Sequence, residues 1–188
     1  MKRLFISAII SFATILTGYA SDYNVEQANQ IKVEGIAIAH NGRIWMSTHR
    51  QMSGGTEGLV VSYSDDSGVT WKDAKSVDGA DGGVLWIAPN GGLLVFYSLD
   101  GYIYSSACPN ASDASPVWMP QVFVGEGLAT GTPVVCKDRR WVLPAQKADV
   151  GPMVYKSATM GMSWEALDGP RDIPEYVKAH GNNPHLDL

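Results

Sequence analysis

The sequence is poor in cysteine, with only Cys108 and Cys136 among 188 residues. Two cysteines do not make the disulfide framework of a small secreted domain, although they are compatible with an oxidising compartment. A single bridge and two small, half-buried thiols both fit this pattern. No His, Cys and Asp residues have the spacing of metal ligands, and no phosphate-binding glycine loop precedes a helix. We therefore expect neither a metal site nor a cofactor.

Basic residues are also scarce and scattered. The chain has 14 Lys and Arg against 19 Asp and Glu, for a formal net charge of −5. No basic stripe is present that could follow a phosphate backbone. We therefore expect no nucleic-acid partner, and the oligomeric state stays open.

The first twenty residues have the pattern of an export signal. Met1–Arg3 is positively charged, Leu4–Thr17 is apolar without a charge, and Gly18–Ala20 offers the small residues of a cleavage site. The apolar run is short for a membrane span, and polar residues follow it at once. We predict a signal peptide at 1–20 and a secreted or periplasmic chain with no membrane attachment after cleavage, an uncleaved anchor being the weaker interpretation.

Glycine and aromatic residues are plentiful, with 20 Gly, 6 Trp and 8 Tyr, and helix-type patterns are few. This composition is typical of many short strands joined by tight turns. A strand–turn–strand pattern recurs at Gly35–Met46, Val84–Phe96 and Pro133–Leu143, and a fourth copy begins at Asn183. A repeat of this size, with several strands in each unit, indicates propeller blades.

A second marker runs in step with the first. Trp71, Trp118 and Trp164 are 47 and 46 residues apart, each near the end of a polar turn. Within the first unit we predict four strands. They are Val33–Ala39, Ile44–Thr48, Leu59–Tyr63 and a strand that Trp71 opens. Helix is limited to a possible short turn from Asp172 to His180.

One segment matches the Asp-box pattern at every defined position: Ser64, Asp66, Gly68, Thr70 and Trp71. Asp66 is expected to accept hydrogen bonds from turn N–H groups, Gly68 to supply a positive φ, and Trp71 to bury an aromatic face between sheets. We interpret these residues as structural. The segment Ser157–Trp164 is a degenerate copy with Thr159 in place of the aspartate.

The box, the repeat and the export signal together resemble the sialidase superfamily, in its branch of BNR-repeat, exo-α-sialidase-like proteins. The resemblance covers Ile31 to Leu188 and implies an all-β propeller, six-bladed when complete. On this basis residues 21–188 are a partial propeller, the N-terminal part of a longer or truncated product. Its expected blades are approximately 31–80, 81–128 and 129–178, with an incomplete fourth at 179–188.

Functional groups of a propeller are expected near its central channel, on the inner strands and the loops that enter and leave them. As candidate catalytic residues we select His49, Glu57 and Asp81. As candidate substrate-binding residues we select Arg50, Trp86, Gln146, Lys147 and His185.

Each of these residues also has a purely structural interpretation. His49 and Arg50 fit a solvated loop equally well, and Glu57 beside Gly-Gly-Thr fits an exposed loop position. Asp81 fits a turn cap, Trp86 a packing residue and His185 a core histidine. If functional, His49 is suited to proton transfer near neutral pH, and Arg50 to binding an acidic sugar.

The resemblance implies a retaining sialidase, which uses three arginines to hold a carboxylate, an Asp as acid/base and a Tyr activated by a Glu as nucleophile. The first arginine belongs to an Arg-Ile-Pro motif, but the matching stretch here, Val33–Ala37, has no arginine. The leading hypothesis is a secreted sialidase-like glycoside hydrolase acting on an extracellular glycan or polysaccharide. The alternatives are a related propeller that acts on acidic polysaccharide through histidine chemistry, and a non-catalytic glycan-binding propeller or inactive truncated product.

Overall fold

The computed structural model describes residues 32–52 and 54–167. The predicted signal peptide, the Asp172–His180 turn, the start of the fourth repeat and His185 lie outside the described residues. Within the described ranges, no helix is long and apolar enough to cross a membrane.

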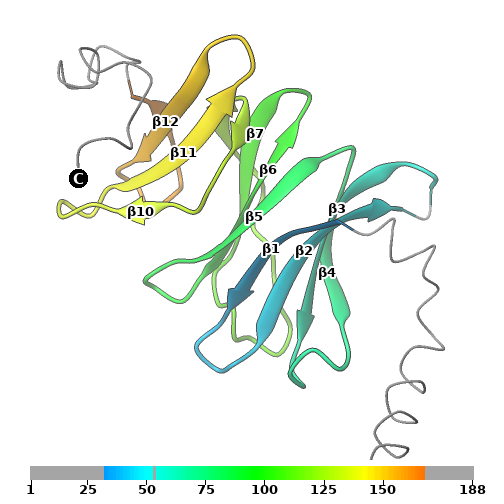
Figure 1. The fold of residues 1–188 in the computed structure, drawn as a ribbon. Helices are drawn as coiled ribbons and strands as arrows, with labels where there is room; N and C mark the ends of the chain where they lie inside the picture. Colours follow the sequence, from blue (N-terminus) through cyan, green and yellow to red (C-terminus); the bar gives the residue numbers. More distant parts are fainter. Residues whose placement is uncertain (1–31, 53, 168–188) are drawn as a thin grey trace, which may run out of the picture.

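The described chain folds into three antiparallel sheets that follow one another along the sequence (Figure 1). The first contains β1 (Lys32–Ile38), β2 (Ile44–Gln51), β3 (Glu57–Ser64) and β4 (Lys72–Asp78). The second contains β5 (Asp81–Ile87), β6 (Leu93–Leu99), β7 (Tyr102–Cys108) and β8 (Val122–Glu126). The third contains β10 (Val134–Val135), β11 (Trp141–Lys147), β12 (Gly151–Ser157) and β13 (Glu165–Ala166), and the short β9 (Leu128–Ala129) pairs with β11. The prediction of an all-β chain is confirmed for these residues.

The predicted strands of the first unit are confirmed, but two of them are longer than expected. The apolar pattern placed the facing ends of β2 and β3 at Thr48 and Leu59. Backbone pairing continues beyond these residues through Arg50 with Gly58 and Gln51 with Glu57. A prediction from apolar side chains underestimates the length of a strand that ends in polar residues. Backbone groups form the ladder, and they pair whatever the side chain. His49 and Arg50 therefore lie on a strand and not in a loop.

Alternation along β2 and β3 directs one set of side chains toward the second sheet. Trp45, Leu59 and Val61 are fully buried there, in a cluster that also contains Leu93, Val95 and Tyr97 of the second sheet. A second cluster, with Phe96, Ile103 and Leu143, fills the space between the second and third sheets. Both faces of the second sheet are therefore covered, as expected for sheets stacked on one another.

A buried arginine joins the first sheet to a loop of the second. The Arg43 side chain is 4% exposed and forms a bidentate ion pair with Asp65, at 2.6 and 3.1 Å. It also donates to the Asp113 carbonyl and stacks over the Tyr63 ring at 4.2 Å. The Trp45 indole N–H donates to the Ala111 carbonyl at 3.0 Å. These contacts fix the loop that follows β7 on the rim of the first sheet.

Two glycines allow β5 to approach the first sheet closely. A Cβ at Gly83 would lie 2.7 Å from Leu59 Cδ1 and 2.9 Å from Ser47, and a Cβ at Gly35 would lie 2.6 Å from the Gly83 carbonyl oxygen. The Ser47 hydroxyl donates to that same carbonyl. Any side chain at Gly35 or Gly83 would push the two sheets apart, so glycine is required at this contact.

The Asp-box closes the β3–β4 connection. The Thr70 N–H and hydroxyl donate to Asp66 at 2.8 and 2.6 Å, and the Gly68 N–H donates to Ser64 Oγ at 2.8 Å. Gly68 has φ of 89°. The carboxylate thus organises the turn, with both of its oxygens used.

The degenerate box of the third sheet keeps the same geometry. The Gly161 N–H donates to Ser157 Oγ at 2.9 Å, and the Ser163 N–H donates to Thr159 Oγ1 at 2.8 Å. A threonine hydroxyl thus accepts the bond that Asp66 accepts in the first sheet, which explains how the turn survives without the aspartate.

The repeated tryptophans do not all pack alike. Trp118 lies edge-on to Trp45 with ring centroids 6.0 Å apart, and Trp164 lies edge-on to Phe96 at 5.6 Å. Each therefore packs against the sheet that precedes its own. Trp71 belongs to the first sheet, which has no preceding sheet among the described residues, and it is only half-buried. Its indole N–H donates to the Gly68 carbonyl at 3.0 Å.

The Asp66 bonds make the fold sensitive to acid. Hydrogen bonds from Thr70 and Ser64 lower the pKa of Asp66 from 3.8 to about 2. Since the folded pKa lies below the unfolded value, this stabilisation is complete above about pH 4 and is lost as the pH falls toward 2. We expect Asp66→Asn to reduce the urea midpoint at pH 6 and to weaken its fall between pH 4 and 2. An unchanged pH dependence would contradict this role of Asp66.

The glycine contact predicts a second stability effect. We expect Gly83→Ala to destabilise the fold by about 1–3 kcal/mol, because the added methyl overlaps Leu59 and Ser47. Gly54→Ala is the matched control, since a Cβ there has nothing within 4 Å. Chemical denaturation of both variants measures the difference. Equal midpoints for the two variants would show that the sheets adjust to the methyl without cost.

Candidate functional site

One end of the strand array gathers most of the predicted site residues. Each antiparallel strand reverses the direction of the one before, so some strands end here and others begin here. The strands that end here are β2, β6, β8 and β11, and those that begin here are β3, β5, β7 and β12. A groove of about 480 Å³ opens at this end beside the start of β5. Its lining comes from the second and third sheets and the connections between their strands: Asp81, Ser98, Asp100, Gly101, Tyr102, Glu126, Gly127, Leu128, Gln146, Lys147, Ala148 and Asp149.

Three predicted site residues therefore share this groove. Asp81 is the first residue of β5, and Gln146 and Lys147 are the last two residues of β11. Asp81 and Gln146 are about 65 positions apart in the sequence, and they line one groove because β5 contacts β9, which pairs with β11 of the third sheet.

His49 adjoins the groove through Asp81. The His49 Nε2 atom lies 3.7 Å from Asp81 Oδ1, and the two side chains are 21% and 80% exposed. His49 lies on the face of β2 that meets the second sheet, in line with Trp45 and Ser47. The half-buried imidazole thus faces an open carboxylate across the contact between the two sheets.

An ion pair lies beside the histidine on the neighbouring strand β1. Lys32 is the register partner of His49 in the β1–β2 ladder, and its ammonium group lies 2.8 Å from Glu34 Oε1. The hydrogen bond to Glu34 raises the pKa of Lys32, and the charge of Asp81 adds to the effect.

The far wall of the groove is held by Glu126. Lys147 forms an ion pair with the Glu126 carboxylate, which raises the pKa of Lys147. The Tyr155 hydroxyl donates to the Glu126 carbonyl at 2.7 Å. A Cβ at Gly127 would overlap the Gln146 carbonyl oxygen, so glycine lets this connection pass directly against β11.

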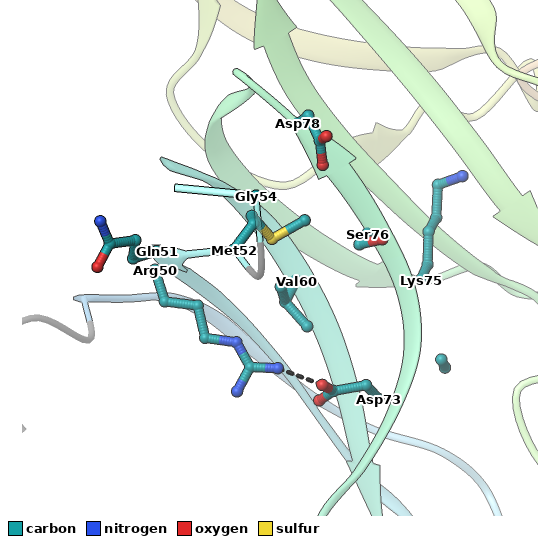
Figure 2. Close-up of a pocket in the computed structure, with 10 residues that line it drawn as sticks. Arg50, Gln51, Met52, Gly54, Val60, Asp73, Lys75, Ser76 and Asp78 are labelled. Carbon is teal, nitrogen blue, oxygen red and sulfur yellow. Dashed lines mark hydrogen bonds and ion pairs between the residues drawn. The ribbon is translucent and has the colours of Figure 1, made fainter. Parts of the chain in front are cut away.

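Arg50 points away from the groove. It follows His49 in β2 and therefore projects from the opposite face of the first sheet. There it pairs with Asp73 (Figure 2). Asp73 also accepts a hydrogen bond from the Ser62 hydroxyl at 2.7 Å. A separate pocket of about 770 Å³ lies on that face, lined by Arg50, Val60, Asp73 and their neighbours. The structure does not bring Arg50 together with His49, Asp81, Gln146 and Lys147.

The other predicted residues lie elsewhere. Trp86 packs edge-on against Trp141 with ring centroids 4.8 Å apart and lines an apolar pocket with Ile38, His40 and Pro133, toward the other end of β5. Glu57 is exposed at the start of β3 and lines none of these three pockets.

Several groove residues were not predicted from the sequence. Asp100 lies in the β6–β7 turn, Tyr102 begins β7, Glu126 ends β8, and Asp149 lies in the β11–β12 turn. Asp100-Gly101, with φ of 53° and 81°, is a two-residue hairpin turn that its position between two apolar runs could have revealed. Glu126 and Asp149 carried no comparable signal, because an acidic residue at a strand end usually faces solvent.

In residues 32–52 and 54–167, no group of three or more His, Cys, Asp and Glu side chains is arranged to hold a metal ion. Cys108 and Cys136 are both free thiols in the structure. Burial raises the pKa of Cys108.

Comparisons with known proteins show a likeness of fold. No protein-family model and no curated protein matches this sequence. Among solved structures, a protein of unknown function from Dyadobacter fermentans aligns with a TM-score of 0.51 at 15% identity, over 73% of this chain and 54% of that chain. A Hadza microbial sialidase aligns with a TM-score of 0.50 at 12% identity, over 73% of this chain and 37% of the sialidase.

An α-L-arabinofuranosidase from Fusarium graminearum, solved with an iminosugar inhibitor, aligns with a TM-score of 0.51 at 16% identity, over 74% of this chain and 48% of the enzyme. This chain thus spans between 37 and 54% of the length of the three structures. At these identities the likeness shows the fold alone. The chain is an all-β array of antiparallel sheets whose fold is similar to part of each of these three structures.

Proposed function

We propose that this chain contributes to a glycoside hydrolase that acts on an extracellular glycan or polysaccharide, with its site in the groove beside β5. The observation that carries the proposal is the meeting of Asp81, Gln146 and Lys147 in one groove, with His49 against Asp81. The fold likeness to a sialidase and an arabinofuranosidase supports carbohydrate as the substrate class. A fold hosts many activities, so the chemistry rests on the groove residues.

His49 is the proposed general acid and Asp81 its positioning residue. A carboxylate beside an imidazole orients the ring. In the proposed reaction, protonated His49 gives its proton to the glycosidic oxygen as the bond to the anomeric carbon breaks. Water adds to that carbon, and its proton returns to the imidazole. The 3.7 Å separation of His49 and Asp81 is expected to shorten when substrate excludes water.

Gln146 and Lys147 are the proposed substrate-binding residues. Successive side chains of a strand project from opposite faces, so the Lys147 ammonium, on the face toward Glu126, is the donor offered to sugar hydroxyl and ring oxygens, and Gln146 borders the groove at the end of the same strand. Both groups lie at the end of β11, so the sheet fixes their backbone. Rigid placement lowers the entropic cost of orienting a substrate.

Export and a six-bladed propeller belong to the same proposal at a finer level, and sialidase-type chemistry is the alternative to the His49 mechanism. The charged and apolar pattern of residues 1–20 supports export, and the repeat of about fifty residues supports further blades. For sialidase chemistry, the absence of arginine from Val33–Ala37 is the main point against. The alternative of a non-catalytic glycan-binding propeller uses the same groove.

Variants of His49 and Asp81 test the proposal. Glycosidase activity of the full-length protein is measured on a panel of aryl glycosides and by release of reducing sugar from polysaccharides. We expect His49→Ala to lower kcat by about 10²–10⁴-fold, because it removes the proton donor. Asp81→Asn should lower kcat by a smaller factor, because it only disorients the imidazole.

His40→Ala is the matched control, since His40 is exposed and lies toward the other end of the first sheet. It should keep full activity. Full activity in His49→Ala would rule out the assigned role, and binding of a glycan without release of sugar from any substrate would favour the binding alternative.

A further inference from the structure

The charge of the groove indicates which glycans it accepts. Among the residues that the structure describes, four carboxylates line it, from Asp81, Asp100, Glu126 and Asp149, and Lys147 is the single basic side chain of the lining. Lys147 is already paired with Glu126, and the charge of Asp149 further raises its pKa. Within residues 32–52 and 54–167, no lysine or arginine of the groove lining is therefore free to bind an anion.

The arginines of the described chain lie away from the groove. Arg43 is buried against Asp65, and Arg50 pairs with Asp73 on the opposite face of the first sheet. Arg140 pairs with Asp138, and Arg139 shares the same turn before β11, at the other end of the third sheet. Bidentate binding of a sugar carboxylate requires an arginine fork, and none of these four faces the groove.

An exposed aromatic ring supplies a surface suited to an uncharged sugar. Tyr102 lines the groove, is 43% exposed and rests on Phe123 with ring centroids 6.0 Å apart. The electron-rich face of an aromatic ring attracts the weakly positive C–H groups of a pyranose or furanose. Carboxylates beside it accept hydrogen bonds from sugar hydroxyls, and such charge-assisted bonds are the stronger kind.

We propose that the groove selects glycans without acidic groups, so that its substrate is a neutral glycan and not a sialylated, uronic or sulfated one. This inference rests on the proposed function. Among the described residues, an acidic sugar in the groove would meet four like charges and no free lysine or arginine, with only the imidazolium proposed at His49 on its border to offset them. A neutral sugar would meet the same groups as hydrogen-bond acceptors.

Binding to an array of neutral, sialylated, uronate-containing and sulfated glycans tests the selection. The full-length protein is applied at low and high salt. We expect the strongest binding to neutral glycans, with acidic relatives of the same backbone bound at least about tenfold more weakly at low salt. The difference should shrink at high salt, because ions screen the repulsion.

Removing charge from the groove tests whether the preference for neutral glycans arises there. In the double variant D100N/D149N, acidic glycans should gain about tenfold in affinity at low salt, while neutral glycans gain no affinity, because they lose two charge-assisted acceptors. Asparagine tolerates the positive φ of position 100, so the turn is expected to persist. The control D113N/E165Q removes two charges outside the groove lining and should leave the preference unchanged.

The outcomes separate this inference from the function on which it rests. Preferential binding of acidic glycans would overturn the selection while leaving a glycan-directed function in place. An equal effect of the control variant would show that the groove is not the source of the preference. Absence of binding to any glycan, with no sugar released from any substrate, would overturn the proposed function and the selection together.

Discussion

The close approach of β5 to the first sheet is the contact on which the rest of this structure depends. Gly35 and Gly83 allow the two backbones to meet, and the Ser47 hydroxyl closes the contact by donating to the Gly83 carbonyl. Beside this contact, Trp45 and Leu59 are fully buried. Burial of large apolar side chains between sheets provides the favourable free energy, and the glycines set the spacing at which that burial is achieved.

The same contact places the candidate site. Because β5 begins two residues before Gly83, Asp81 emerges beside the end of β2, where His49 lies on the buried face. The connection after β8 repeats this arrangement one sheet later, where Gly127 passes against β11 and brings Glu126 to Lys147. The groove is thus formed by the packing of successive sheets. A change in the spacing of the sheets would displace its polar residues.

The Asp-box and the groove lie at opposite ends of the strands. Ser64–Trp71 joins the end of β3 to the start of β4, whereas the groove surrounds the start of β5 and the end of β11. Arg43 anchors that opposite end by joining Asp65, next to the box aspartate, to the loop of the second sheet. The motif that points most clearly to the fold therefore carries no information about the chemistry. Substitutions in the box would act on stability, and substitutions in the groove on recognition.

The sequence by itself determined the local structure: the strands of the first unit, the turn at Ser64–Trp71 and its degenerate copy at Ser157–Trp164. These depend on alternation, on turn chemistry and on one side chain bonding its own turn, all of which are local. Only the tertiary structure decided which polar residues meet. His49 and Arg50 are adjacent in sequence, yet successive side chains of a strand point to opposite faces, and only His49 faces Asp81. Glu126 and Asp149 gained their place in the groove from the packing of one sheet on the next, which no spacing along the chain reveals.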